Sequence, residues 1–173
     1  RADAVPAHVR EMLRELGRVA DVLRRRRAAS GALLFTLPDV WCETDADGRA
    51  KAFHRRTAHV AYALIEELML LANMIVARRL ASARVPAIYR IHAPPDADQW
   101  ERMEMALLEL GVRMSSPDRH GALEALREVQ GTAREYPVAM TVLRHLKRAE
   151  YSTRCGLHFG LAARPYTHFT SPI

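Results

Sequence analysis

The chain has 173 residues, about the length of one domain, and 49% of them are hydrophobic, which is enough to supply a core. The formal charge is +6, from 26 Lys and Arg against 20 Asp and Glu, and nearly all of the basic residues are Arg. This balance argues against an acidic or disordered chain. It favours a polyanionic partner without proving one, because Arg binds phosphate through two parallel hydrogen bonds.

The sequence also predicts where the protein works. Cys42 and Cys155 are far apart and lack metal-ligand spacing, which favours a reducing, cytoplasmic compartment. The apolar stretch at 58–77 is interrupted by two carboxylates, an imidazole and an amide, so no membrane span is expected. Because the chain opens on Arg1 and ends on Ile173 directly after Ser-Pro, we expect a piece of a longer protein.

The first predicted element is an amphipathic helix that begins after Pro6 and ends before Gly31. Its apolar residues recur every three or four positions, Pro suits the first turn, and Gly ends a helix. The helix closes on the basic run Arg24–Arg27. Two interpretations of this run stay open, a solvated helix end or a contact with RNA phosphate.

Extended segments follow this helix. Ala32–Leu37 and Val40–Glu43 are apolar, 45–48 is a turn signal, and Arg49–Arg55 can return as the second strand of a hairpin. The two turn aspartates are only a faint match to a calcium loop, whose twelve-residue ligand pattern is missing, so no metal is expected there.

The remaining elements alternate helices with short extended segments. They are a long helix from Ala58 to Ala83, a strand at 87–92, a helix from Pro94 that Gly111 ends, and helices at 122–130 and 136–148. The long helix is apolar on nearly every face, which is typical of a buried helix. After Tyr151 the helical period stops, and short strands and loops are expected. The elements together predict a helix-rich α/β fold, with helices packed on short mixed or antiparallel strands.

The long helix carries a line of polar residues. His59, Glu66 and Asn73 are seven positions apart, so they project from one face about 10 Å apart along the axis. A buried carboxylate needs partners. The line therefore either makes structural hydrogen bonds to loops or forms a cleft wall that binds substrate hydroxyls such as a ribose 2′-OH. Glu67 lies about 100° away around the helix and is expected outside this site.

The end segment, Arg154–Ile173, concentrates hydroxyls, imidazoles and aromatic rings. Gly156 and Gly160 within it permit close approach of the backbone. Such a composition suits base stacking beside phosphate binding, and an irregular core is the alternative.

Several blocks of the sequence resemble the ribonuclease II/ribonuclease R (RNB) family. They are the lead-in Gly31–Pro38, Ala58-His59 with Leu64–Asn73, then Tyr89–Pro95, and finally His158–Ala162 with Tyr166–Ile173. A lone Ser-Pro-Ile would mean little. The ordered set is specific because it spans nearly the whole chain.

The resemblance implies that residues 1–173 are the C-terminal portion of a single RNB catalytic domain, truncated at both ends. The parent would be a monomeric 3′→5′ exoribonuclease that hydrolyses single-stranded RNA to nucleoside 5′-monophosphates with Mg²⁺. The family's metal ligands are an upstream Asp cluster, and its catalytic Arg would follow Ile173. No catalytic residue or metal ligand is therefore expected within this chain, and the piece alone is expected to be inactive.

The same resemblance implies which residues bind RNA. Glu66 matches a position that contacts the ribose near the RNA 3′ end, and the rest of its polar line would accompany it. The loop that presents the missing Arg to phosphate lies in the end segment, where His158 and Phe159 are expected to be scaffold. The expected RNA-binding residues are Glu66, His59, Asn73, Tyr166, His168, Thr170 and Ser171.

Two alternatives remain open from the sequence. One is a non-catalytic RNA-binding member of the same family that has lost its metal aspartates. The other drops the resemblance and leaves a basic helical interaction module, which predicts that Glu66 and the end segment lie far apart.

Overall fold

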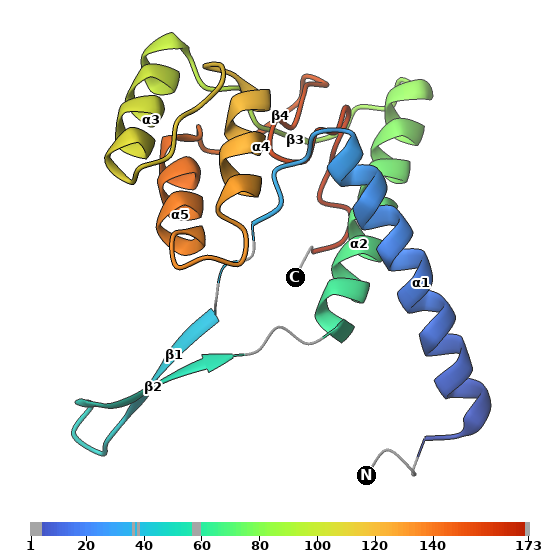
Figure 1. Cartoon of the computed structure of the whole chain (residues 1–173). Helices are drawn as coiled ribbons and strands as arrows, with labels where there is room; N and C mark the ends of the chain where they lie inside the picture. The colour runs from blue at the N-terminus through green and yellow to red at the C-terminus, as the bar shows by residue number, and fades with distance from the viewer. Residues whose placement is uncertain (1–4, 36, 38, 57–59, 172–173) are drawn as a thin grey trace.

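The computed structural model describes residues 5–35, 37, 39–56 and 60–171 of the chain. Helices and short strands alternate along these residues (Figure 1). In chain order they are α1 Ala7–Ala29, β1 Asp39–Thr44, β2 Ala50–Arg56, α2 Val60–Ser82, β3 Tyr89–Ile91, α3 Ala97–Glu109, α4 Arg119–Glu128, α5 Glu135–His145 and β4 Glu150–Ser152. The predicted helix-rich α/β fold is confirmed.

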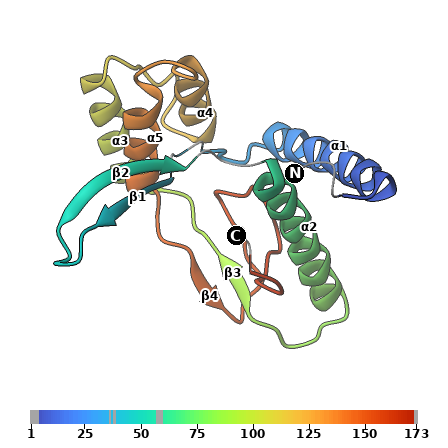
Figure 2. The same ribbon diagram turned by 90° about the horizontal axis from the view of Figure 1, so that it is seen from below.

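The described strands form two separate antiparallel pairs. β1 and β2 make the predicted hairpin, which projects away from the helices in both views (Figures 1 and 2). β3 pairs with β4 far along the chain, so that Arg90 lies opposite Tyr151. The predicted extended segment 32–37 forms no strand in its described residues, where Leu33 instead donates its N–H to the carbonyl of Gly160 at 2.9 Å.

Helices α3, α4 and α5 enclose the main core. Asp96 caps α3 and Asp118 caps α4, so α4 begins at Arg119 rather than near residue 122. Gly111 adopts a φ of +72° just after α3, a conformation that favours glycine and ends the helix as predicted. The fully buried core side chains include Met103, Leu107, Val112, Val129, Val138 and Val142.

Helix α2 lies at one side of the molecule, beside α1 and the C-terminal segment (Figure 2). The expectation that it is buried on nearly every face is wrong for this chain, because only five of its 23 residues are buried. Val60, Tyr62, Ile65 and Ile75 are exposed, since α1 and the C-terminal segment cover one side of α2 alone. Within the described residues α2 is long and apolar enough to cross a bilayer, but a core helix meets the same criteria, so this carries no argument for a membrane.

A buried ion pair joins α1 to α2. The Arg27 Nε donates to Glu67 Oε2 at 3.0 Å, and its Nη2 donates to Glu67 Oε1 at 2.5 Å. The two side chains are 9% and 3% exposed. Neither interpretation of the Arg24–Arg27 run foresaw this, because its last member faces the helix partner while Arg25 and Arg26 are exposed.

Removing one partner of this pair is expected to destabilise the fold strongly, because the other charge stays buried without a counterion. Arg27→Met is expected to lower the free energy of unfolding by about 3 kcal/mol in urea titrations. The double variant Arg27→Met/Glu67→Leu is expected to recover most of that loss. The exposed neighbour Arg26→Met serves as control, with a change within about 0.5 kcal/mol. Equal losses in the single and double variants would contradict this account.

Candidate functional site

The side chain of Asn73 fastens α2 to the C-terminal segment. Its Nδ2 donates to Tyr166 Oη at 3.1 Å and to the Thr170 carbonyl at 2.9 Å. Its Oδ1 accepts from the Thr170 N–H at 2.6 Å and from the Thr170 hydroxyl at 3.2 Å. Asn73 is fully buried, so these four bonds satisfy the hydrogen-bonding capacity of its amide. For Asn73 the structural interpretation of the polar line is therefore the correct one.

Glu66 remains open to solvent on the same helix. Its side chain is 41% exposed, and its Oε1 lies 3.7 Å from Arg27 Nη2. At that distance the guanidinium attracts the carboxylate without donating a short hydrogen bond to it. The Glu66 carboxylate is therefore partly open to solvent, where it can accept a hydrogen bond from a ligand. The expectation that Glu67 lies outside this site needs refinement, because Glu67 and Glu66 contact the same guanidinium.

Aromatic rings and imidazoles form a continuous row across the C-terminal segment. The Tyr166 ring contacts His158 at 5.2 Å and His168 at 5.4 Å between centroids, both edge to face. His158 in turn meets His92 at 5.2 Å. At the other end, Tyr151 Oη lies 3.1 Å from His168 Nδ1. The row runs from buried His92 to exposed Tyr151 and His168.

Burial lowers the pKa values of the imidazoles in this row. It lowers the pKa of His158 to about 4, with smaller contributions from the charges of His92 and Arg90. The pKa values of His92 and His168 are also lowered, first by burial. In keeping with neutral rings, His92 Nδ1 accepts the Gly160 N–H at 3.1 Å, and His158 Nδ1 accepts the Leu161 N–H at 3.3 Å.

The tight backbone approach foreseen at the two glycines is present. A Cβ on Gly160 would lie 3.2 Å from His92 Nδ1, and one on Gly156 would lie 2.8 Å from Ile91 Cγ2. His158 and Phe159 act as scaffold, since Phe159 is 4% exposed in the main core.

The structure brings most of the predicted RNA-binding residues together. Glu66 and Asn73 lie on α2, and the end segment is fastened directly to that helix through Tyr166 and Thr170. Burial raises the pKa of Tyr166, and the charge of Glu66 adds a smaller rise, so the two side chains are within electrostatic reach. The basic interaction module, which required Glu66 and the end segment to lie far apart, is therefore wrong.

The other predicted RNA-binding residues differ in their exposure. His168 and Ser171 are exposed at the surface, while Tyr166 is buried with 1% of its area exposed. His59 lies outside the described residues. Sequence reasoning did not single out Arg90, which lies within the family block Tyr89–Pro95, and it considered Arg27 only as one member of the basic run.

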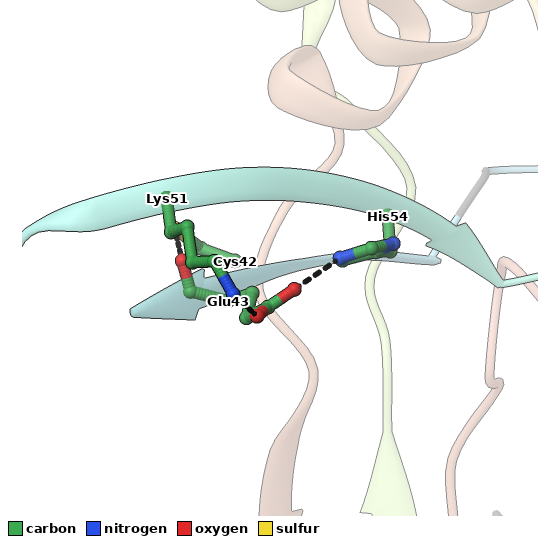
Figure 3. A network of polar contacts seen from close by, with 4 residues as sticks. All are labelled: Cys42, Glu43, Lys51 and His54. Carbon is green, nitrogen blue, oxygen red and sulfur yellow. Dashed lines mark hydrogen bonds and ion pairs between the residues drawn. The ribbon is translucent and has the colours of Figure 1, made fainter. Parts of the chain in front are cut away.

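The described residues offer no fit for a metal ion, because they contain no group of three or more His, Cys, Asp or Glu side chains that could hold one. Asp45 instead closes the hairpin turn, accepting the N–H groups of Asp47 and Arg49. Figure 3 shows the polar network of the hairpin, in which Glu43 binds Lys51 at 2.6 Å and His54 at 2.9 Å. These contacts connect the two strands and point to no ligand.

The buried imidazoles predict a dependence of stability on pH. The folded-state pKa of His158, about 4, lies below its ordinary value of 6.5, so the unfolded chain binds the extra proton. The contribution of His158 to the free energy of unfolding is complete above pH 6.5 and is lost as the pH falls toward 4. The urea midpoint of the wild-type chain is therefore expected to fall more steeply between pH 6.5 and 4.5 than that of His158→Gln. The exposed His8→Gln is the matched control and is expected to follow the wild type, and parallel curves for all three would contradict the argument.

Comparison with known proteins identifies the family. The RNB domain matches residues 1–173, the whole chain. Ribonuclease R of Aquifex aeolicus is 35% identical over 166 residues, and ribonuclease R of Escherichia coli is 32% identical over 164. The matches cover 94% and 93% of this chain but only 24% and 20% of those relatives. The chain thus spans about a quarter or less of their length.

Solved structures show the same fold. Mycoplasma genitalium RNase R in complex with ribose methylated single-stranded RNA has a TM-score of 0.87 and 23% identity, covering 98% of this chain and 27% of that one. Yeast Ssd1, a pseudonuclease, gives a TM-score of 0.55 and 18% identity over 65% of this chain and 15% of that one. Together with the family match, these likenesses confirm the resemblance seen in the sequence, and the chain belongs to the RNB-domain family.

Proposed function

We propose that this chain is the RNA-contacting part of a 3′→5′ exoribonuclease domain that degrades single-stranded RNA to nucleoside 5′-monophosphates. One observation carries the proposal. A partly exposed carboxylate, Glu66, lies on the same helix as Asn73, which fastens the end segment to that helix, in a chain that matches the RNB domain throughout. Relatives named ribonuclease R at 35% and 32% identity support the same activity.

In this proposal the residues of the chain bind and orient RNA. The Glu66 oxygens accept a hydrogen bond from a ribose hydroxyl, which a DNA strand lacks at the 2′ position. Arg27 keeps the carboxylate in place through its charge. His168 and Ser171 lie exposed on the loop that leads to the end of the chain.

The chemical step is assigned to groups outside this chain. Two-metal hydrolysis with Mg²⁺ would need carboxylate ligands, and the described residues contain no such group. We place the Asp ligands and the catalytic Arg in flanking parts of the protein. A monomeric enzyme that works in the cytoplasm, without a membrane, completes the proposal.

A second candidate function is a non-catalytic RNA-binding protein of the same family. The observation that favours it is the likeness to yeast Ssd1, a pseudonuclease, at a TM-score of 0.55. Sequencing the open reading frame on both sides discriminates the two. An upstream Asp cluster and an Arg after Ile173 are expected for the enzyme, and their loss would favour the second candidate.

Removing the Glu66 carboxylate is expected to weaken discrimination between RNA and DNA. Glu66→Ala is expected to reduce the ratio of RNA to DNA affinity about fivefold, the equivalent of one hydrogen bond of about 1 kcal/mol. Fluorescence anisotropy with matched oligoribonucleotides and oligodeoxyribonucleotides measures this ratio. Glu66→Gln keeps one acceptor oxygen, so its ratio of RNA to DNA affinity is expected to lie between those of the wild type and Glu66→Ala. The exposed Glu101→Ala on α3 is the control. An unchanged ratio in Glu66→Ala would refute the ribose contact.

The 173-residue chain is expected to bind RNA without degrading it when Mg²⁺ is added. The reason is that its described residues contain no ligand set for the ion. Chromatography of a labelled oligoribonucleotide detects any mononucleotide released, with a ribonuclease R as positive control. Steady release in proportion to the concentration of the pure chain would place the catalytic groups within residues 1–173.

A further inference from the structure

A second polar cluster lies next to the end segment, on the sheet of β3 and β4. The Arg90 guanidinium carbon lies 4.7 Å from the centroid of the Tyr151 ring, which occupies the opposite position on β4. Tyr151 Oη lies 3.1 Å from His168 Nδ1. We refer to Arg90, Tyr151 and His168 as the Arg90 cluster. Figure 2 shows β3 and β4 side by side, with the C-terminal segment between them and α2.

Two members of the Arg90 cluster are open to solvent, and the third, Arg90, is half-buried and has no counterion among the described residues. Tyr151 is 61% exposed, and His168 is exposed as well. Arg27 is neutralised by Glu67, but in the described part of the chain no carboxylate lies within ion-pair distance of Arg90. A cation held over an aromatic ring without a counterion attracts anions.

The charge of Arg90 acts on titratable side chains of the end segment. Its charge lowers the pKa values of His158 and His168, in each case after the larger effect of burial. The pKa of Tyr166 is raised by burial, and the charge of Arg90 partly opposes this rise while the charge of Glu66 adds to it. The cluster and Glu66 are therefore both within electrostatic reach of the same phenol.

We propose that the Arg90 cluster binds a phosphodiester group of single-stranded RNA whose ribose is read at Glu66. The inference rests on the proposed function and adds to it the residues that take the phosphate. Arg90 offers a planar fork of donors that matches two phosphate oxygens.

Tyr151 positions the two donors of this site. Its ring supports the guanidinium. In the tautomer that we assign to His168, the Tyr151 hydroxyl donates to Nδ1 and the ring proton lies on Nε2. The Nε2–H group is then available to donate to a phosphate oxygen. Tyr151 is thus a positioning residue, while Arg90 and His168 contact the phosphate.

The test is binding of a fluorescein-labelled oligoadenylate to the 173-residue chain at several KCl concentrations. Arg90→Gln is expected to weaken binding about tenfold, as for a hydrogen-bonded charge, and to reduce the slope of log K against log [KCl] by about 0.7. Arg90→Lys is expected to keep the slope and to bind more weakly than the wild type, because it retains the charge without the fork. Tyr151→Phe is expected to weaken binding a few-fold at an unchanged slope.

The matched control is Arg10→Gln, an exposed arginine about 25 Å along α1 from Arg27. It is expected to leave both affinity and slope unchanged. Urea midpoints show whether each variant is folded. If Arg90→Gln does not fold, the surface variants Tyr151→Phe and His168→Ala carry the test, and His168→Ala is expected to weaken binding about fivefold.

The outcomes separate this inference from the proposed function. Tight RNA binding by the wild type with the same affinity and slope in Arg90→Gln overturns the phosphate site and leaves the proposed function standing. If Arg90→Gln is unfolded, wild-type affinity in both Tyr151→Phe and His168→Ala overturns the phosphate site and leaves the proposed function standing. Absence of any RNA binding by the folded wild type overturns both.

Discussion

The arrangement of the candidate site depends on one buried amide. Asn73 makes four hydrogen bonds to residues 93 and 97 positions further along the chain, and both of its donors and both lone pairs of its oxygen are used. An unsatisfied polar group at this depth would be costly, so the end segment has one favoured position against α2. That position fixes the Tyr166 ring, and through it the packing of His158 and His168.

Much of the local structure could be predicted from the sequence because it depends on local chemistry. Helix limits followed from Pro6 and Gly111, and the hairpin followed from its turn signal. The seven-residue spacing correctly placed Glu66 and Asn73 on one face of one helix. The spacing determines which face of the helix a side chain lies on, but it does not determine whether another segment buries that face. Whether a position is buried depends on where the end segment crosses α2, and so Asn73 is structural while Glu66 stays open.

The rest could not be predicted because it depends on packing between distant segments. In the Arg24–Arg27 run all four residues look alike, and only the crossing of α1 over α2 selects Arg27 as the buried partner of Glu67. The same crossing buries α2 along one side only, which overturned the expectation of a helix covered all round. Arg90 meets Tyr151 only through the register of β3 and β4, two strands that carry no signal of their pairing.

The two proposed contacts differ in the sign of their charge, and this difference gives the site a direction. Around Arg27, one guanidinium faces two carboxylates, so Glu66 keeps a net negative surrounding that suits a hydroxyl donor and repels phosphate. Around Arg90, a cation faces an aromatic ring and an imidazole, which suits phosphate. Because Glu66 lies on α2 and Arg90 lies on β3, the two proposed contacts together place the ribose toward α2 and the phosphate toward β3 and β4. One ribose and one phosphate of the strand then meet protein groups of opposite charge.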